Sequence, residues 1–117
     1  MKRLVLVLLV IGSMCSAAGA AITVDATTSI DRSPASKTVT STAFSTHAAP
    51  TLLLAFVSAD YLSGSNTSVT GISGGGLTGS LVVRSNAQRG TAEIWRAFAT
   101  SPLTSATVKA TLSQSVV

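Results

Sequence analysis

TLLLAFVSA, residues 51–59, is the most apolar stretch after residue 20, and it decides the fold class of this chain. Its apolar residues follow one another without the spacing of an amphipathic helix. A short unbroken run of this kind predicts a central β-strand that is covered on both of its faces. Pro50 immediately precedes the run and fixes the start of the strand.

The rest of the chain after residue 20 also has strand patterns, and no segment of it holds a convincing helical period. The further predicted strands are residues 22–26, 37–44, 68–72, 80–84, 92–99 and 105–112. Segments rich in glycine, asparagine and serine separate several of them, at residues 63–66, 73–76 and 85–90. Seven short strands predict one all-β domain, an antiparallel β-sandwich of jelly-roll type.

The composition favours strands over helices. Charged residues make up 10% of the chain, whereas an average globular protein has roughly 25%. Serine, threonine, glycine and alanine take their place, which is typical of strands with hydroxyl-rich outer faces. Exposed helix faces usually carry Glu, Lys and Arg instead.

Residues 1–20 are predicted to be a secretory signal peptide. A basic start is followed by the apolar run LVLVLLVI (residues 4–11) and by the small residues Ala18-Gly19-Ala20. A membrane-spanning helix needs about 20 apolar residues, so this run is too short for a stable span. An uncleaved anchor and a lipoprotein attached through Cys15 are the alternatives. Cleavage after the signal peptide predicts a secreted chain, extracellular or at the cell surface, that begins at Ala21.

Removal of the signal peptide changes the charge and the cysteine count. The whole chain carries a formal charge of +4, and the chain that begins at Ala21 carries +2. So small a charge, spread along the sequence, predicts no nucleic-acid partner. Cys15 is the only cysteine. The predicted domain, residues 21–117, therefore has neither a disulfide nor a thiol nucleophile and depends on its apolar core.

The last residues of the sequence suggest that the domain continues. Ser115, Val116 and Val117 resemble the opening of another strand more than a polar tail. A domain that ended there would leave an unpaired sheet edge, which natural proteins tend to protect. We therefore expect residues 21–117 to be an incomplete β-sandwich domain.

The order of the motifs resembles that of a known class of modules. LLLAFVSAD (residues 52–60) is followed by VTGISGGGLT (69–78), LVVR (81–84) and GTAEIWRA (90–97), and an alternating strand of threonine and valine closes the pattern. This order resembles secreted bacterial β-sandwich modules of jelly-roll type, rich in Ser, Thr and Gly, many of which have no known ligand. The resemblance covers residues 21–117 but only part of the usual module, which agrees with an incomplete C-terminal end. It implies a fold and says little about activity, because one sandwich fold hosts many functions.

No catalytic set is recognisable in the sequence. His47 is the only histidine and is expected in an exposed loop without a strong acidic partner. The four acidic residues are scattered, so the sequence predicts neither a glycosidase with paired carboxylates nor another enzyme. No metal or cofactor is predicted, and a structural calcium ion held by Asp25, Asp31 and Asp60 is the alternative.

Asp60 and Tyr61 are the predicted ligand-binding residues, because they follow the apolar strand and precede a loop of serine and glycine. Trp95 and Phe98 are the other aromatic side chains considered for stacking on a sugar ring. Strand alternation places these two on opposite faces, and Trp95 is predicted to pack in the core.

These observations predict a secreted, non-catalytic module for extracellular binding or adhesion, with a carbohydrate or another cell-surface component as its partner. Two alternatives stay open. One is a structural cell-envelope component that assembles through sheet edges. The other is the N-terminal fragment of a larger extracellular protein or hydrolase.

Overall fold

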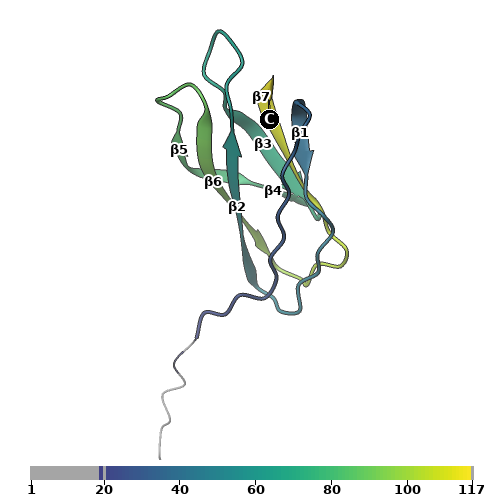
Figure 1. Ribbon diagram of the computed structural model, residues 1–117. Coiled ribbons are helices and arrows are strands. Elements are labelled where there is room, and N and C mark those ends of the chain that lie inside the picture. The colour runs from purple at the N-terminus through teal and green to yellow at the C-terminus, as the bar shows by residue number, and fades with distance from the viewer. Residues whose placement is uncertain (1–18, 20, 117) are drawn as a thin grey trace, which may run out of the picture.

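The computed structural model describes residue 19 and residues 21–116, and Figure 1 shows their arrangement. The regular elements are β1 (Ser36–Thr40), β2 (Thr51–Ala59), β3 (Val69–Gly74), β4 (Leu77–Thr78), β5 (Ser80–Ser85), β6 (Thr91–Ala99) and β7 (Val108–Val116). In this part of the chain no helix is long and apolar enough to span a membrane. The predicted signal peptide lies outside the described residues, apart from Gly19.

The strands form two antiparallel sheets. One sheet has the order β1-β7-β3-β4 and the other the order β2-β6-β5. Figure 1 shows β5, β6 and β2 on one side of the molecule and β3, β7 and β1 on the other. Every strand pair runs antiparallel. The prediction of an all-β antiparallel fold is confirmed, and the two-sheet arrangement is compatible with a β-sandwich.

The core lies between the two sheets. Strand β6 alternates, so that Glu93 and Trp95 point inward whereas Phe98 lies on the outer face. Only 8% of the surface of Trp95 is exposed, which confirms its predicted place in the core. The other buried members of the cluster are Val69, Ile72, Ala110, Leu112 and Val116. Since these five come from β3 and β7, the cluster joins the two sheets.

Strand β2 has the predicted bounds, but the prediction that it is central and covered on both faces is wrong. It pairs only with β6 and forms an edge of the three-stranded sheet. Leu52, Leu54 and Phe56 form its outer row and keep 50%, 51% and 72% of their surface exposed. Even on the inner row no residue of β2 is fully buried. An unbroken apolar run shows that both faces of a strand are apolar, but it does not show that both are covered.

The predicted strand at residues 22–26 is absent from the structure. Val24 is 81% exposed, and Asp25 accepts a hydrogen bond of 2.7 Å from the backbone N–H of His47. Alternation of apolar and polar residues gives no strand unless a neighbouring strand edge is available for pairing.

The last strand is displaced from its predicted position. It begins at Val108 rather than at Ser105, and it continues through Ser115 to Val116. Val116 pairs with Ser36 of β1 and is buried. The interpretation of Ser115 and Val116 as the opening of another strand is therefore wrong, because they prolong β7.

Candidate functional site

Three strands of the β2-β6-β5 sheet bring their loops to the same end of the sheet. Ala59, the last residue of β2, pairs with Thr91, the first residue of β6. Ser85, the last residue of β5, pairs with Ala92. The segment that follows β2 and the hairpin at residues 86–90 therefore leave the sheet side by side.

The hairpin at residues 86–90 is held close to the end of β2. Arg89 has a positive φ of 78°, and a Cβ atom added at Gly90 would lie 2.8 Å from the carbonyl oxygen of Ala59. Only glycine allows this approach without a shift of backbone. The loop before β3 adds support, since Thr67 donates its backbone N–H to the carbonyl of Arg89 over 2.8 Å.

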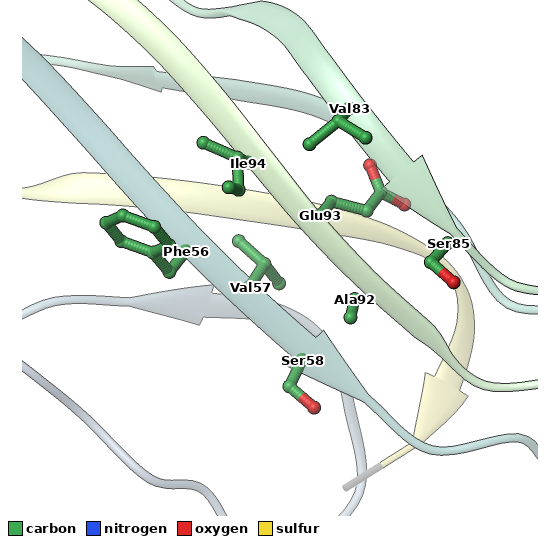
Figure 2. A pocket seen from close by; sticks show the side chains of 8 residues that line it. All are labelled: Phe56, Val57, Ser58, Val83, Ser85, Ala92, Glu93 and Ile94. Carbon is green, nitrogen blue, oxygen red and sulfur yellow. The ribbon is translucent and has the colours of Figure 1, made fainter.

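Two rows of side chains cross the face of the β2-β6-β5 sheet that points away from the other sheet. We call this face the outer face. The first row is apolar and consists of Phe56, Ile94 and Val83. The second row is small and consists of Ser58, Ala92 and Ser85. Figure 2 shows both rows running across the three strands. Because the second row is small, the outer face is hollowed between the apolar row and the loops.

The hollow has an apolar part and a polar part. The apolar depression has a volume of about 390 Å³ and is lined by Phe56, Val57, Ser58, Val83, Ser85, Ala92, Glu93 and Ile94. The polar cleft has a volume of about 420 Å³ and is lined by Ser58, Ala59, Asp60, Ser85, Asn86, Ala87, Gln88, Gly90, Thr91 and Ala92. Since the small row belongs to both, the two parts are continuous. The polar cleft offers one carboxylate, two amides and the hydroxyls of Ser58 and Ser85 to a ligand, since the Thr91 hydroxyl is donated to Glu93.

The structure separates the roles of the two predicted ligand-binding residues. Asp60 is exposed and lines the polar cleft, and its Oδ1 accepts a hydrogen bond of 2.7 Å from the backbone N–H of Tyr61. Tyr61 is half-buried and does not line the cleft. Its hydroxyl donates to the carbonyl of Gly64 over 3.2 Å, and the guanidinium of Arg89 lies 5.3 Å from the centre of its ring. The Tyr61 ring thus anchors the hairpin beside the cleft.

Phe56 is an aromatic residue of the site that was not predicted from the sequence. The expectation of a strand covered on both faces assigned its side chain to the core, whereas it is 72% exposed beside the small row. Phe98 is also exposed, at 58%, but it lines neither the apolar depression nor the polar cleft. The spacing of Leu52, Leu54 and Phe56 on alternate positions is the sequence signal that groups them on one face.

Glu93 is the most heavily bonded side chain among the described residues. Its carboxylate accepts hydrogen bonds from the backbone N–H of Val69, from Nε and Nη2 of Arg84, from the Thr91 hydroxyl and from Trp95 Nε1, at 2.7–3.1 Å. Its side chain is fully buried, whereas that of Arg84 is 31% exposed. We call these five residues the Glu93 network. It ties β5 and β6 to β3 of the other sheet.

The Glu93 network keeps the carboxylate ionised. Burial by itself raises the pKa of Glu93, but the hydrogen bonds that it accepts, those from Arg84 first, outweigh burial and leave its pKa below the ordinary value. A carboxylate with all its acceptor positions occupied has no free oxygen for a substrate. Glu93 therefore stabilises the sheet on which the outer face is built.

Asp25 is the second carboxylate that is paired with a basic side chain, and its partner is His47. His47 is exposed, as expected, but the expectation that it lacks an acidic partner is wrong, because Nδ1 of His47 lies 2.9 Å from Oδ1 of Asp25. The hydrogen bonds from His47 lower the pKa of Asp25 below its ordinary value. No serine or threonine hydroxyl among the described residues is hydrogen-bonded to His47, so the pair ties the segment before β1 to the loop before β2.

The carboxylates considered for calcium do not come together. Within residues 19 and 21–116, no group of three His, Cys, Asp or Glu side chains is placed so that it could hold a metal ion. Asp31 caps the backbone N–H of Arg32 at 3.0 Å, and Asp25 is engaged with His47.

Neither a protein-family model, nor a curated protein, nor a solved structure matches this chain. The resemblance to jelly-roll modules rests on the sequence motifs, and the structure supports its coarser part, the two antiparallel sheets.

Proposed function

We propose that this chain is a secreted, non-catalytic binding module of jelly-roll type whose outer face binds carbohydrate at a cell surface. Residues 1–20 direct its export as a signal peptide, and residues 21–117 belong to the β-sandwich domain. The proposal rests on one observation, the continuous hollow that joins the apolar row, which includes the exposed ring of Phe56, to a cluster of polar side chains.

Sugars present apolar C–H faces and a rim of hydroxyl groups, and the hollow offers partners for both. Phe56 supplies an exposed ring on which a sugar face can stack. The Asp60 carboxylate accepts hydrogen bonds from hydroxyls, and the Asn86 and Gln88 amides both donate and accept them. A few polar groups beside an apolar surface are the usual composition of a small-molecule site.

The small row sets the room available to a ligand. Ala92 lies at its centre, between Ser58 and Ser85, and is exposed. A larger side chain at this position would fill the hollow from its floor without entering the core, because the inner neighbours Glu93 and Thr91 point the other way.

The test uses the chain expressed as residues 1–117 in a secreting host and purified as the cell processes it, applied to an array of bacterial and plant glycans. We expect binding to at least one glycan class and about tenfold weaker binding by Phe56→Ala, equivalent to the loss of about 1.4 kcal/mol. Ala92→Leu is expected to abolish binding. Phe98→Ala removes an exposed aromatic residue outside the hollow and serves as the control.

Three results bear against the proposal. They are the absence of binding to any glycan, equal losses in Phe56→Ala and Phe98→Ala, and full binding by Ala92→Leu. Circular dichroism of each variant shows whether a loss of binding reflects a loss of fold. Mass spectrometry of the purified chain shows whether it begins at Ala21, which tests the export signal separately.

A further inference from the structure

Strand β2 is the one edge strand among the described strands that is long, regular and free of charged residues. Natural edge strands are kept from pairing by shortness, bulges or charges. Strand β4 has two residues, β1 carries Lys37 and a shift of register between Ser36 and Thr38, and β5 carries Arg84 and a shift between Leu81 and Val83. Strand β2 is nine residues long, has no charged residue and pairs with β6 without any irregularity.

We propose that β2 pairs in antiparallel fashion with β2 of a second copy of this chain, about a two-fold axis at Ala55. Such a contact must be self-complementary, because a two-fold axis brings the same surface of both copies together. The proposal concerns the edge of the sheet and goes beyond the binding function proposed for the hollow.

The sequence of β2 is self-complementary about Ala55. On the outer row, Leu54 faces the partner's Phe56, and Leu52 faces the partner's Ser58. On the inner row, Leu53 faces the partner's Val57. No charged side chain meets another at any of the nine positions, and the outer pair of Leu54 with the partner's Phe56 brings two exposed apolar side chains together.

A ladder of this length is adequate for a specific interface. An antiparallel pair of nine-residue strands forms about eight to ten backbone hydrogen bonds, and a typical protein interface has about ten. Leu54 and Phe56 are 51% and 72% exposed in the single chain, so pairing also removes apolar surface from water. The two copies then form one continuous six-stranded sheet.

The first experiment measures the molar mass of the purified chain, expressed as residues 1–117, by light scattering during size-exclusion chromatography over a range of concentrations. We expect a dimer for the parent chain. Leu54→Lys is expected to be a monomer at concentrations at which the parent is dimeric, because two unpaired lysines would lie in the new ladder. Phe98→Lys places a lysine on the same face but on β6, and is expected to remain a dimer.

The second experiment tests the register. When the Leu54→Lys variant is mixed with the Phe56→Glu variant, the proposed register places the lysine of one chain opposite the glutamate of the other. This mixture is therefore expected to form a heterodimer. Mixing Leu54→Lys with Leu52→Glu leaves the two charges apart, so this mixture is expected to stay monomeric. Circular dichroism confirms that each variant keeps its β-sheet spectrum.

Several outcomes would overturn the proposal. These are a monomeric parent chain, a dimer that Leu54→Lys leaves intact, and two mixtures that behave alike. A dimer lost in Phe98→Lys and kept in Leu54→Lys would show that the outer faces stack, which also overturns edge pairing. Glycan binding is read in a separate assay, so failure of the dimer and failure of the proposed function are distinguished.

Discussion

The inner and outer faces of the β2-β6-β5 sheet both carry aromatic side chains, with Trp95 inside and Phe56 and Phe98 outside. Trp95 is covered by the second sheet and donates its indole N–H to Glu93 over 2.8 Å. Phe56 and Phe98 have no such cover among the described residues, and Phe56 stands beside a hollow. The same strand alternation thus produces a face that stabilises the fold and a face that is available to a partner.

The largest effect is expected inside, at Glu93. Glu93→Ala leaves the Arg84 guanidinium, Trp95 Nε1 and the Val69 N–H without their acceptor. The Val69 N–H and Trp95 Nε1 are buried donors, and each one left unpaired costs about 1–3 kcal/mol, which urea unfolding followed by tryptophan fluorescence can measure. Asp60→Ala, on the outer side of the same sheet, is the control and is expected to change the free energy of unfolding by less than about 0.5 kcal/mol. Equal effects at the two positions would contradict the division between the faces.

Removal of single aromatic rings compares the two faces directly. Trp95→Ala is expected to lower the free energy of unfolding by about 3–5 kcal/mol, because it opens a cavity in the core and removes a donor to Glu93. Phe98→Ala removes a ring that is 58% exposed and is expected to cost less than about 1 kcal/mol. Chemical denaturation followed by far-ultraviolet circular dichroism measures the free energy of unfolding of both variants. A larger loss in Phe98→Ala would mean that the outer face is covered in solution.

Acid is expected to weaken the inner face selectively. The pKa of Glu93 is lower in the folded chain than its ordinary value of 4.5. The unfolded chain therefore takes up the proton first as the pH falls. The stability that Glu93 contributes is fully present above about pH 4.5 and is lost as the pH falls through the folded-state pKa.

The check is the free energy of unfolding measured from pH 7 down to pH 2.5. Glu93→Gln is expected to remove most of the acid-dependent loss. Asp25→Asn is the matched control, since the pKa of Asp25 is also lowered but its carboxylate lies at an exposed contact with His47. A profile that is steep in Glu93→Gln and flat in Asp25→Asn would contradict this assignment.

The smallest effect is expected at a single hydroxyl near the Glu93 network. Thr67 is fully buried, and its Oγ1 has no hydrogen-bond partner in the part of the chain that the structure describes. Thr67→Val removes this unsatisfied group and is expected to raise the free energy of unfolding by about 1 kcal/mol. Thr70→Val, at an exposed threonine that donates to the Thr111 carbonyl over 3.1 Å, is the control and is expected to bring no gain. A loss of stability in Thr67→Val would indicate that the hydroxyl has a partner in solution.

The sequence predicted the strands better than it predicted their surroundings. The bounds of β2 and the inward position of Trp95 follow from apolar length and from alternation, which are local properties of the chain. The exposure of Phe56 depends on which strands lie beside and above β2, and no local pattern contains that information. The strand predicted at residues 22–26 does not form for the same reason, because these residues have no neighbouring strand edge with which to pair.

The candidate site was only partly predictable. Asp60 could be predicted because it directly follows the most apolar strand, and it does line the polar cleft. The small row of Ser58, Ala92 and Ser85 comes from three strands, and its alignment depends on a shift of register between Leu81 and Val83 that the sequence does not reveal. The partners of Glu93 likewise come from β3, β5 and β6.

The most direct test of the division between the two faces is a nuclear magnetic resonance titration of the secreted chain with the glycan that binds best on the array. The account predicts that backbone amide shifts change at Ser58, Asp60, Ser85 and Gln88 around the hollow, while those of Ala110 and Leu112 in the four-stranded sheet stay fixed. Shifts concentrated on β7 or β1, with none around the hollow, would contradict it.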